Sequence, residues 1–414
     1  MGSAAAVRAV NALGARWAEQ AATGEHGTVL MPAGIWPLLG LLAPGASPAV
    51  RAELEEALGM RADAAAEQAR ALLGTLRGLP GVSAALGLWT TERFPPRPDW
   101  LAGLPADVHG GLTGDDGRDR KVLDAWAARA TGGLIDRMPV AVTEDTVLVL
   151  ASALTVQTDW IQPFSRYWPE LDSGPWAGRP VQALGRWMHL LDRAAVADTP
   201  AGPVTEVRVL GRGDIDVHLL LGEPDAAPGQ VLAAGIGILS HRHPRVTADR
   251  LPVGSPGPGL SIGWSRSYTP EPELHVMLAE FTVQADHDLL ARSGLFGLTT
   301  AATGTRTENR LPGVVDAPWL FVDSARQTAT ATFGERGFRA AAVTAIGSAA
   351  GSAPTRPPYV VRQVQAHFDR PFGFLAVHRT SRLVFAAGWV TEPDEYQHDE
   401  EPDEDAQDEE SFDM

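Results

Sequence analysis

The residue types that usually carry catalysis are few in this chain and lie far apart. There is no cysteine, which excludes disulfides, thiolate zinc sites and cysteine nucleophiles. Neither a G-x-S-x-G nucleophile turn nor an H-E-x-x-H zinc helix occurs. His241 and His243 could contact a metal, but matching ligands are absent nearby, and an exposed loop is expected there. We therefore expect no catalytic set, no metal site and no cofactor.

Two short motifs look like binding signatures but have simpler explanations. Arg212-Gly213-Asp214 spells a cell-adhesion tripeptide, yet Gly and Asp are ordinary turn residues, and a hairpin turn is expected there. The glycine-rich stretch 257–263 lacks the strand-to-helix context of a phosphate-binding loop. The Gly/Pro-rich residues 252–260 are therefore predicted to form a plain loop.

One segment is unusual enough to suggest a function. Residues 334–362, GERGFRAAAVTAIGSAAGSAPTRPPYVVR, are a long connection of small residues between two well-defined strands. Compact domains seldom contain such loops unless they serve a function. Apart from Glu335, Arg336 and Arg339, no charge occurs before Arg356. The segment could therefore pair as a strand if a sheet edge were offered.

The elements around this segment are helices early in the chain and strands late. Predicted helices cover about 4–22, 33–43, 47–59, 62–76, 119–130 and 285–293. Predicted strands cover 82–91, 145–158, 204–222 as a hairpin, 273–283, 318–333 and 371–390 as a pair. The run VLVLASALTV inside 145–158 is apolar on both faces, as in a central strand. The lack of regular alternation favours an α+β fold.

Charge is concentrated at the C-terminus. The net charge is −17, and thirteen Asp and Glu lie in residues 392–414 without any Lys or Arg, which leaves about −4 for the rest. We expect 394–414 to be a disordered acidic tail, either solubilising or docking a basic partner. The nearly neutral body offers no basic face for nucleic acid.

The remaining composition bears on location and origin. No run of 18 apolar residues occurs, so no membrane span is expected. The N-terminal stretch reads as an amphipathic helix, which predicts a cytoplasmic chain, or a secreted one if a signal peptide has been removed. The abundance of Ala, Gly, Pro and Arg is typical of a GC-rich genome.

Six segments resemble the serpin family, in order along the chain. They are LAPGASPAVRAELEEALGM (42–60), ALGLWTTERFPPRPDWL (85–101), LDAWAARATGGLI (123–135), DTVLVLASALTVQTDWIQPF (145–164), VMLAEFTV (276–283) and FDRPFGFLAVHRTSRLVFAAGWVTEP (368–393). The resemblance implies a bacterial-type member with one serpin-like domain over 1–393. Its helices would pack around three mixed or antiparallel β-sheets, with an exposed reactive-centre loop at about 335–358.

The loop also resembles the hinge of inhibitory serpins, Glu-x-Gly-Thr-Glu-Ala-Ala-Ala-x-Thr. The matching residues are Glu335, Gly337, Ala340, Ala341, Ala342 and Thr344. The resemblance implies that a protease cleaves the loop and that the hinge then enters sheet A as a new strand, dragging the acylated protease with it. The family spacing places the cleaved bond sixteen residues beyond Glu335, at Gly351-Ser352, with Arg356 or Arg362 as alternatives. The implied partner is a serine protease that prefers small residues, or less readily a cysteine protease.

The inserting face can be read from the period of a strand. Alternate residues share a face, which groups the side chains of Phe338, Ala340, Ala342, Thr344, Ile346, Ser348 and Ala350. All but Phe338 are small or of moderate size. Phe338 lies where the family prefers Thr or Ser, and an overpacked ring costs about 1–3 kcal/mol. Insertion would still be favourable, but we expect Phe338 to slow it.

The polar cluster that usually holds serpin sheet A closed is altered. The corresponding positions carry Gly34, Asp124, Ser152 and Gln327, with Trp160 as the family tryptophan of the gate. Buried polar clusters act as units, so these replacements change how easily the strands part. We hypothesise that Asp124 and Gln327 form a substitute pair.

Three functional hypotheses follow from the sequence. The first is a monomeric suicide-substrate inhibitor of a protease. The second is a non-inhibitory serpin-fold protein that serves as a binding or maturation partner. The third is a scaffold repurposed as an enzyme that acts on a peptide.

Overall fold

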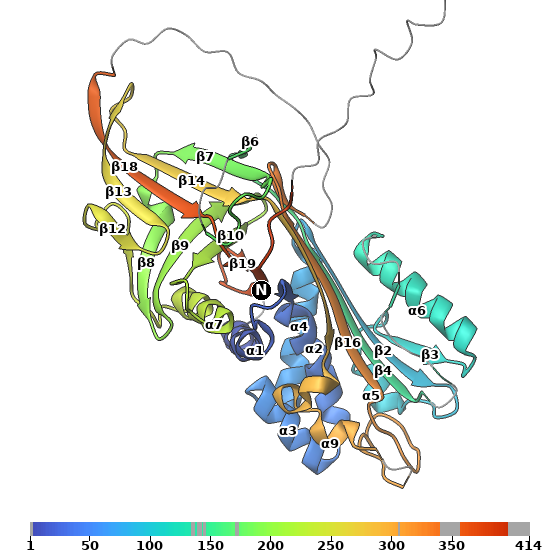
Figure 1. Ribbon diagram of the computed structural model, residues 1–414. Coiled ribbons are helices and arrows are strands. Elements are labelled where there is room, and N and C mark those ends of the chain that lie inside the picture. Colours follow the sequence, from blue (N-terminus) through green and yellow to red (C-terminus); the bar gives the residue numbers. More distant parts are fainter. Residues whose placement is uncertain are drawn as a thin grey trace, which may run out of the picture.

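Three β-sheets carry the fold in the computed structural model, which describes residues 3–133, 137–138, 143, 146–169, 174–304, 307–339 and 357–395 (Figure 1). Sheet A contains β2 (Val82–Thr91), β3 (His109–Leu112), β4 (Leu148–Val156), β5 (Thr158–Asp159), β15 (Phe281–Asp288), β16 (Ser324–Phe333) and β17 (Gly337–Arg339). Its strand order is β3-β2-β4-β16-β17-β5, with β15 on the other edge of β16. The predicted central strand is β4, which pairs with β2 on one side and β16 on the other.

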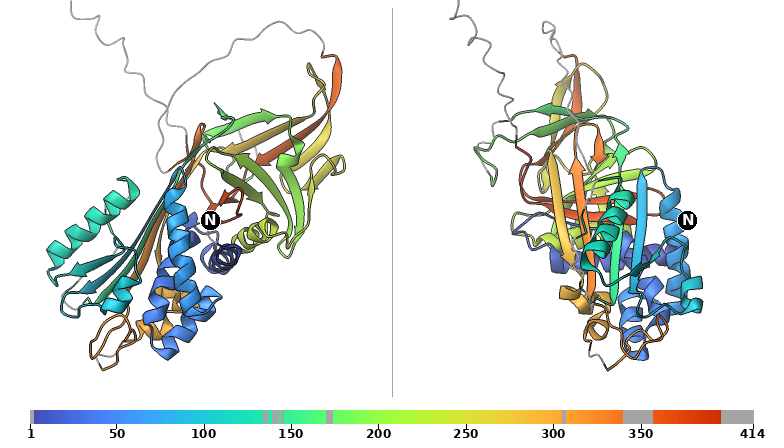
Figure 2. Two further views of the ribbon diagram at one scale, coloured as in Figure 1. Left: turned by 180° about the vertical axis from the view of Figure 1, so that it is seen from behind. Right: turned by 90° about the vertical axis from the view of Figure 1, so that its right-hand side faces the viewer.

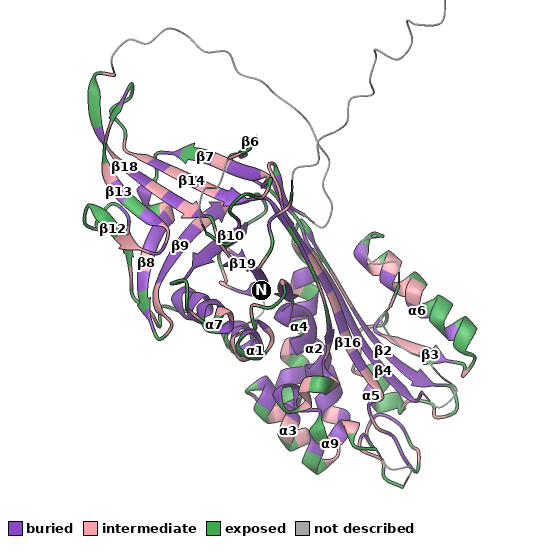
Figure 3. Ribbon diagram, in the orientation of Figure 1, coloured by how far each residue is buried: buried purple, intermediate pink, exposed green. Residues whose placement is uncertain are grey.

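Sheets B and C form the other half of the molecule. Sheet B runs in the order β1 (Thr28–Leu30), β20 (Val384–Val390), β19 (Phe372–His378), β10 (Ile215–Leu221), β9 (Gly202–Leu210), β8 (Ala194–Thr199) and β11 (Arg245–Thr247). Sheet C runs in the order β12 (Gly254–Gly257), β13 (Leu260–Ser267), β18 (Tyr359–Phe368), β14 (Glu273–Ala279), β7 (Ala183–Met188) and β6 (Ser165–Tyr167). Sheet B is the most completely buried, because β10, β19 and β20 carry buried residues only (Figure 3).

Helices cover both faces of sheet A and one face of sheet B (Figure 2). They are α1 (Ala4–Ala21), α2 (Pro32–Leu42), α3 (Pro48–Leu58), α4 (Ala62–Gly78), α5 (Pro98–Ala102), α6 (Asp116–Thr131), α7 (Pro228–Leu239), α8 (Ser293–Phe296) and α9 (Thr299–Ala302). Short 3-10 turns cover η1 (Ala43–Gly45), η2 (Leu191–Arg193) and η3 (Leu290–Arg292). Helix α6 packs on β2 and β4 from the side opposite α2 and α4. Within the described ranges, no helix combines the length and apolarity needed to cross a bilayer.

Local sequence signals explain most helix ends. The Ser3 hydroxyl caps α1 by accepting from Ala6 N at 3.2 Å, and the Asp115 carboxylate caps α6 by accepting from Arg118 N at 2.8 Å. Helix α3 starts at Pro48 and ends at Leu58, and it is followed by the cap residue Gly59, whose φ of 68° suits glycine. These ends agree with the predicted ones within three residues.

Two predictions about local structure were wrong. The helix predicted at 285–293 was wrong in its first part: residues 285–288 belong to strand β15, which pairs with β16 along its whole length, whereas η3 and the start of α8 at Ser293 are helical. Tertiary pairing thus overrides a helical pattern. Residues 252–260 were predicted to be a loop, but they include β12, which pairs with β13 through a register shift at Gly254 and Gly257. Helix α7 was also missed.

Sheet B contains a buried ionic cluster. The Glu206 carboxylate on β9 accepts from His218 Nδ1 on β10 at 2.6 Å and from Arg245 Nη1 on β11 at 2.8 Å. Burial would raise the pKa of Glu206, but the hydrogen bond and charge of His218 and the charges of Arg245 and Arg208 outweigh it and lower the pKa to about 2. The cluster ties three strands of sheet B together through one carboxylate.

The variant Glu206→Gln tests this cluster because it removes the charge and keeps the shape. A pKa lowered by folding contributes stability that is complete above the ordinary value near 4.5 and is lost as the pH falls toward about 2. We expect the variant to lose on the order of 3 kcal/mol of unfolding free energy at pH 7, and this difference should shrink at pH 3. Urea unfolding at both pH values measures it, with exposed Glu19→Gln as control. A difference that is constant with pH contradicts the assignment.

Candidate functional site at the hinge and the top of sheet A

The first residues of the predicted hinge are already part of sheet A. Strand β17 lies between β16 and β5 and runs antiparallel to both, with Phe338 opposite Phe333 on one side and Thr158 on the other. The residues before it are also bonded, since Trp160 N donates to Arg336 O at 2.8 Å and Phe164 N to Glu335 O at 2.9 Å. The hinge end of the loop therefore begins as a short inserted strand.

Gly337 is required by the closeness of β5. A side-chain carbon at this position would overlap the carbonyl oxygen of Thr158, which is backbone and cannot turn away. Glycine thus lets β17 approach β5 closely enough to pair. The family resemblance places a glycine here, and the structure gives the physical reason for it.

Phe338 is accommodated rather than excluded. Its side chain is 2% exposed, and its ring centroid lies 5.9 Å from that of Phe374 on β19. The ring therefore fills space between sheets A and B. Phe338 is thus buried within β17, and the expectation that it slows insertion of the rest of the loop stays a prediction.

Trp160 closes the top of this region. Its indole Nε1 donates to Gly334 O at 2.9 Å, and its ring lies 4.6 Å from Phe333 and 6.3 Å from Phe164, centroid to centroid. The side chain is fully buried. Trp160 thus packs where β16 ends and the hinge begins, which suits the gate position given by the resemblance.

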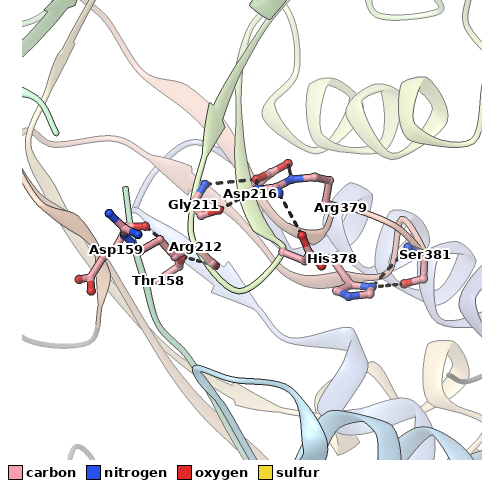
Figure 4. Close-up of polar contacts among 9 residues, drawn as sticks. Thr158, Asp159, Gly211, Arg212, Asp216, His378, Arg379 and Ser381 are labelled. Atoms are coloured by element: carbon pink, nitrogen blue, oxygen red, sulfur yellow. Dashed lines mark hydrogen bonds and ion pairs between the residues drawn. The ribbon is translucent and has the colours of Figure 1, made fainter. Parts of the chain in front are cut away.

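The turn between β9 and β10 of sheet B contacts β5, the strand on the other side of β17 from β16 (Figure 4). Arg212 N donates to Asp159 O at 2.8 Å, and Thr158 Oγ1 donates to Arg212 O at 2.8 Å. The β9–β10 turn is therefore bonded directly to β5. The Arg212-Gly213-Asp214 motif is a turn, as its composition suggested.

Arg379 fixes this turn from the β19–β20 connection. Its guanidinium donates to the buried Asp216 carboxylate at 2.7 and 2.9 Å, to Asp214 at 3.0 Å and to Gly211 O at 2.6 Å (Figure 4). The hydrogen bond and charge of Asp216 raise the pKa of Arg379. Sequence analysis identified the turn at 379–381 but gave no sign of this role, because the partners lie about 165 residues away.

The predicted polar cluster lies lower in sheet A. The Gln327 side chain on β16 accepts from Met31 N at 2.9 Å and donates to Met31 O and to Ser152 Oγ, both at 3.1 Å. A side-chain carbon on Gly34 would lie 3.2 Å from Ser152 Oγ. Three of the four predicted positions thus meet here.

Asp124 does not join this cluster, so the hypothesis of an Asp124–Gln327 pair is wrong. Asp124 is on α6, where its carboxylate accepts from Met138 N at 2.8 Å. Helix α6 covers one face of sheet A, whereas Gln327 reaches toward Met31 and α2 on the other. The sheet itself separates the two side chains.

An ion pair and the start of the tail lie beside the hinge. Arg166 on β6 donates twice to Glu280, at 2.8 and 2.9 Å, and this hydrogen bond raises its pKa, with a smaller effect of Glu335. Asp394 accepts from Thr282 N at 3.0 Å, and burial raises the pKa of Asp394. Residues predicted to open the acidic tail are therefore bonded to the body, which sequence analysis missed.

The rest of the predicted loop can be placed only in part. Ala340, Ala341, Ala342, Thr344, Gly351, Ser352 and Arg356 lie outside the described residues. Arg362 lies within β18, paired with Trp264 of β13, and donates to Ala248 O and Leu251 O. A bond held inside a sheet is a poor protease substrate, so Arg362 is disfavoured as the cleavage point.

These observations define a class of protein in which a long loop joins two sheets. The residues before the loop form a short strand of sheet A, and the residues after it form a strand of sheet C.

Comparison with known proteins points to the same class. The profile of the serpin (serine protease inhibitor) family matches residues 8–170. A sequence of Oryza sativa subsp. japonica provisionally named serpin-Z6C is 27% identical over 94% of this chain and 97% of its own. The sequence is thus similar to serpins, through a family profile over its first part and a plant relative over most of its length.

Solved structures confirm the predicted serpin fold. Human thyroxine-binding globulin complexed with thyroxine superposes with a TM-score of 0.69 at 15% identity, covering 95% of this chain and 99% of the other. Serpin48 of the insect Tenebrio molitor gives a TM-score of 0.67 at 17% identity, covering 94% and 98%. The similarities do not bear on the expected bacterial origin, since the sequence relative is from a plant.

Gly337→Ala tests the inserted hinge. The added methyl group should expel β17, and the loss of one or two backbone bonds of about 1 kcal/mol each should speed amide exchange in residues 332–339 about tenfold. Hydrogen exchange with mass spectrometry measures this. Gly263→Ala is the matched control, because a side-chain carbon there meets nothing within 4 Å. Equal exchange in the two variants would show that β17 is not held by this contact.

Gln327→Leu tests the polar cluster. It leaves both buried backbone groups of Met31 without their side-chain partner, so we expect a loss of about 1–3 kcal/mol of unfolding free energy. Denaturant unfolding measures it, with Gln365→Leu on half-buried β18 as control. A variant as stable as the control contradicts the role given to Gln327.

Proposed function

We propose that this protein is a serpin and acts as a monomeric suicide-substrate inhibitor of a serine protease that prefers small residues. The protease would cleave the loop at Gly351-Ser352, with Arg356 as the alternative. We further propose that 1–393 acts as a single domain and that 394–414 is an acidic tail. The single observation that carries the proposal is the position of β17, inserted between β5 and β16 before any cleavage.

In this mechanism the protease supplies the bond-breaking chemistry, and this chain supplies the conformational change. The protease serine would attack the Gly351 carbonyl, forming an ester and breaking the bond to Ser352, whose nitrogen takes up the proton and leaves as an amine. Residues from Ala340 onward would then be free to extend β17 through sheet A. The protease, esterified at Gly351, would travel with the new strand and be distorted before water could hydrolyse the ester.

The described strands leave room for this extension. Strands β4 and β16 pair with each other only through Val149–Ala151 and Ser324–Arg326 in the part of the chain the structure describes. Above that point β4 is paired with β2 and β16 with β15, so their facing edges can accept a strand. Insertion would break three register pairs and form on the order of ten backbone bonds worth about 10 kcal/mol in total. That gain matches the stability of an ordinary domain.

A second candidate is supported by the buried ring of Phe338. A hinge anchored between sheets A and B could also serve a non-inhibitory serpin, a binding or maturation partner whose loop is never fully inserted. Such a protein would tolerate cleavage without trapping the protease. The two candidates therefore predict different fates for the cleaved molecule.

The decisive experiment combines cleavage, adduct detection and melting. The full chain is incubated with elastase- and subtilisin-type proteases. Inhibition predicts a detergent-resistant adduct, and a melting temperature that rises by at least 10 °C in the cleaved, unadducted molecules, since each kcal/mol shifts it by several degrees.

A matched pair of variants separates insertion from cleavage. Thr344→Arg places a charge on the predicted inserting face and should abolish the adduct while cleavage continues. Ala341→Arg places the same charge on the opposite face and should keep the adduct. Cleavage without adduct or stabilisation in the unaltered chain would reject inhibition in favour of the second candidate.

A further inference from the structure

The end of sheet C next to the loop exposes large apolar side chains. Trp264 on β13 is 64% exposed, and Val360 on β18 is 61% exposed. The two strands are paired antiparallel, with Trp264 opposite Arg362 and Arg266 opposite Val360. Directly opposed residues point to the same side of a sheet, so these four share one face.

The same face is buried lower down. Leu260 and Ile262 precede Trp264 on its side of β13, and their partners Ala366 and Val364 are also buried. Sheet C therefore extends past the layer that covers this face, and the tips of β13 and β18 project beyond the body (Figures 1 and 3). Exposed aromatic and aliphatic residues gathered on such a projection are typical of a contact surface.

Two arginines give this surface a positive charge and tie it to the loop. Arg362 is fixed by its bonds to Ala248 O and Leu251 O. Arg266 is exposed, and its Nη1 donates to Pro357 O at 3.3 Å, at the C-terminal end of the predicted loop. The surface formed by Trp264, Arg266 and Val360 is thus joined to the base of the loop.

We propose that this surface is a second contact site for the protease that cuts the loop, on the side of the cleaved bond toward the C-terminus. The partner it fits has an apolar patch edged by carboxylates beside its active-site cleft. Tryptophan and arginine are the residues that most often dominate binding at protein interfaces. The inference rests on the proposed function, because it assumes that the loop is a protease substrate.

Chain length supports this partner. Val360 lies eight residues after Ser352, and eight extended residues span at most about 28 Å. A protease of about 230 residues has a radius of gyration of about 17 Å, so its body covers a comparable distance. A protease seated on Gly351 therefore lies within reach of Trp264 and Val360.

The test compares the double variant Trp264→Ala/Val360→Ser with Leu101→Ala. Leu101 is 39% exposed on α5, at the far end of sheet A, and controls for loss of an exposed apolar residue. Each full-length protein is titrated with a protease whose catalytic serine is replaced by alanine, and the active protease gives kcat/KM for loop cleavage. A synthetic peptide of residues 340–358 serves as a substrate without the surface.

We expect the double variant to bind and be cleaved at least tenfold more weakly and Leu101→Ala to match the unaltered chain, whereas the peptide, which lacks the surface, should be cleaved no faster than the double variant. Arg266→Glu should lower the association rate, most strongly at low salt. Equal rates in the double variant, no binding to any protease tested, or a dimer of the unaltered chain that the double variant abolishes would overturn the proposal. Cleavage without a stable adduct would reject only the inhibitor function, since the cleavage rates still report on the surface.

Discussion

The antiparallel pairing of Gly337 and Phe338 between β5 and β16 is the constraint on which the rest of the site depends. A strand adds to a sheet only if both neighbours present free edges at the right separation, and starting it costs more than extending it, because the loop must be closed first. In this chain that first step is already made. The surrounding side chains, from Trp160 to Arg379, fix the neighbouring strands β5 and β16 rather than β17 itself.

The two ends of the loop are held very differently. At the hinge, three residues of β17 are paired, and a single buried ring, Phe338, anchors them. At the other end, β18 is ten residues long and is paired along both edges, with β13 and β14. Extending the hinge strand through sheet A requires either a cut in the loop or the loss of both ladders of β18. Under the proposed function, this asymmetry makes a cut in the loop the easier of the two routes.

Sequence analysis predicted the parts of this arrangement that depend on local pattern. The run around Ser152 indicated a central strand, and the small residues after Glu335 indicated a segment able to pair. It failed where distant contacts decide. The strand character of 285–288 depends on β16, and the accommodation of Phe338 depends on Phe374 in another sheet. No local signal indicates either contact.

The altered polar cluster shows how one side chain can replace several. Gln327 satisfies both backbone groups of Met31 and also reaches Ser152, so a single amide links α2, β4 and β16. Gly34 leaves the space that Ser152 needs, which accounts for the loss of a side chain at that position. Asp124 is then free to bond to the backbone at Met138 on the other face. A strand entering between β4 and β16 would have to separate Gln327 from Ser152, yet the bonds from Gln327 to Met31 could persist. Among the described residues, β4 and β16 are thus joined by their three register pairs, by the hydrogen bond from Gln327 to Ser152 and, just below the strands, by that from Val147 N to the Asp323 carboxylate.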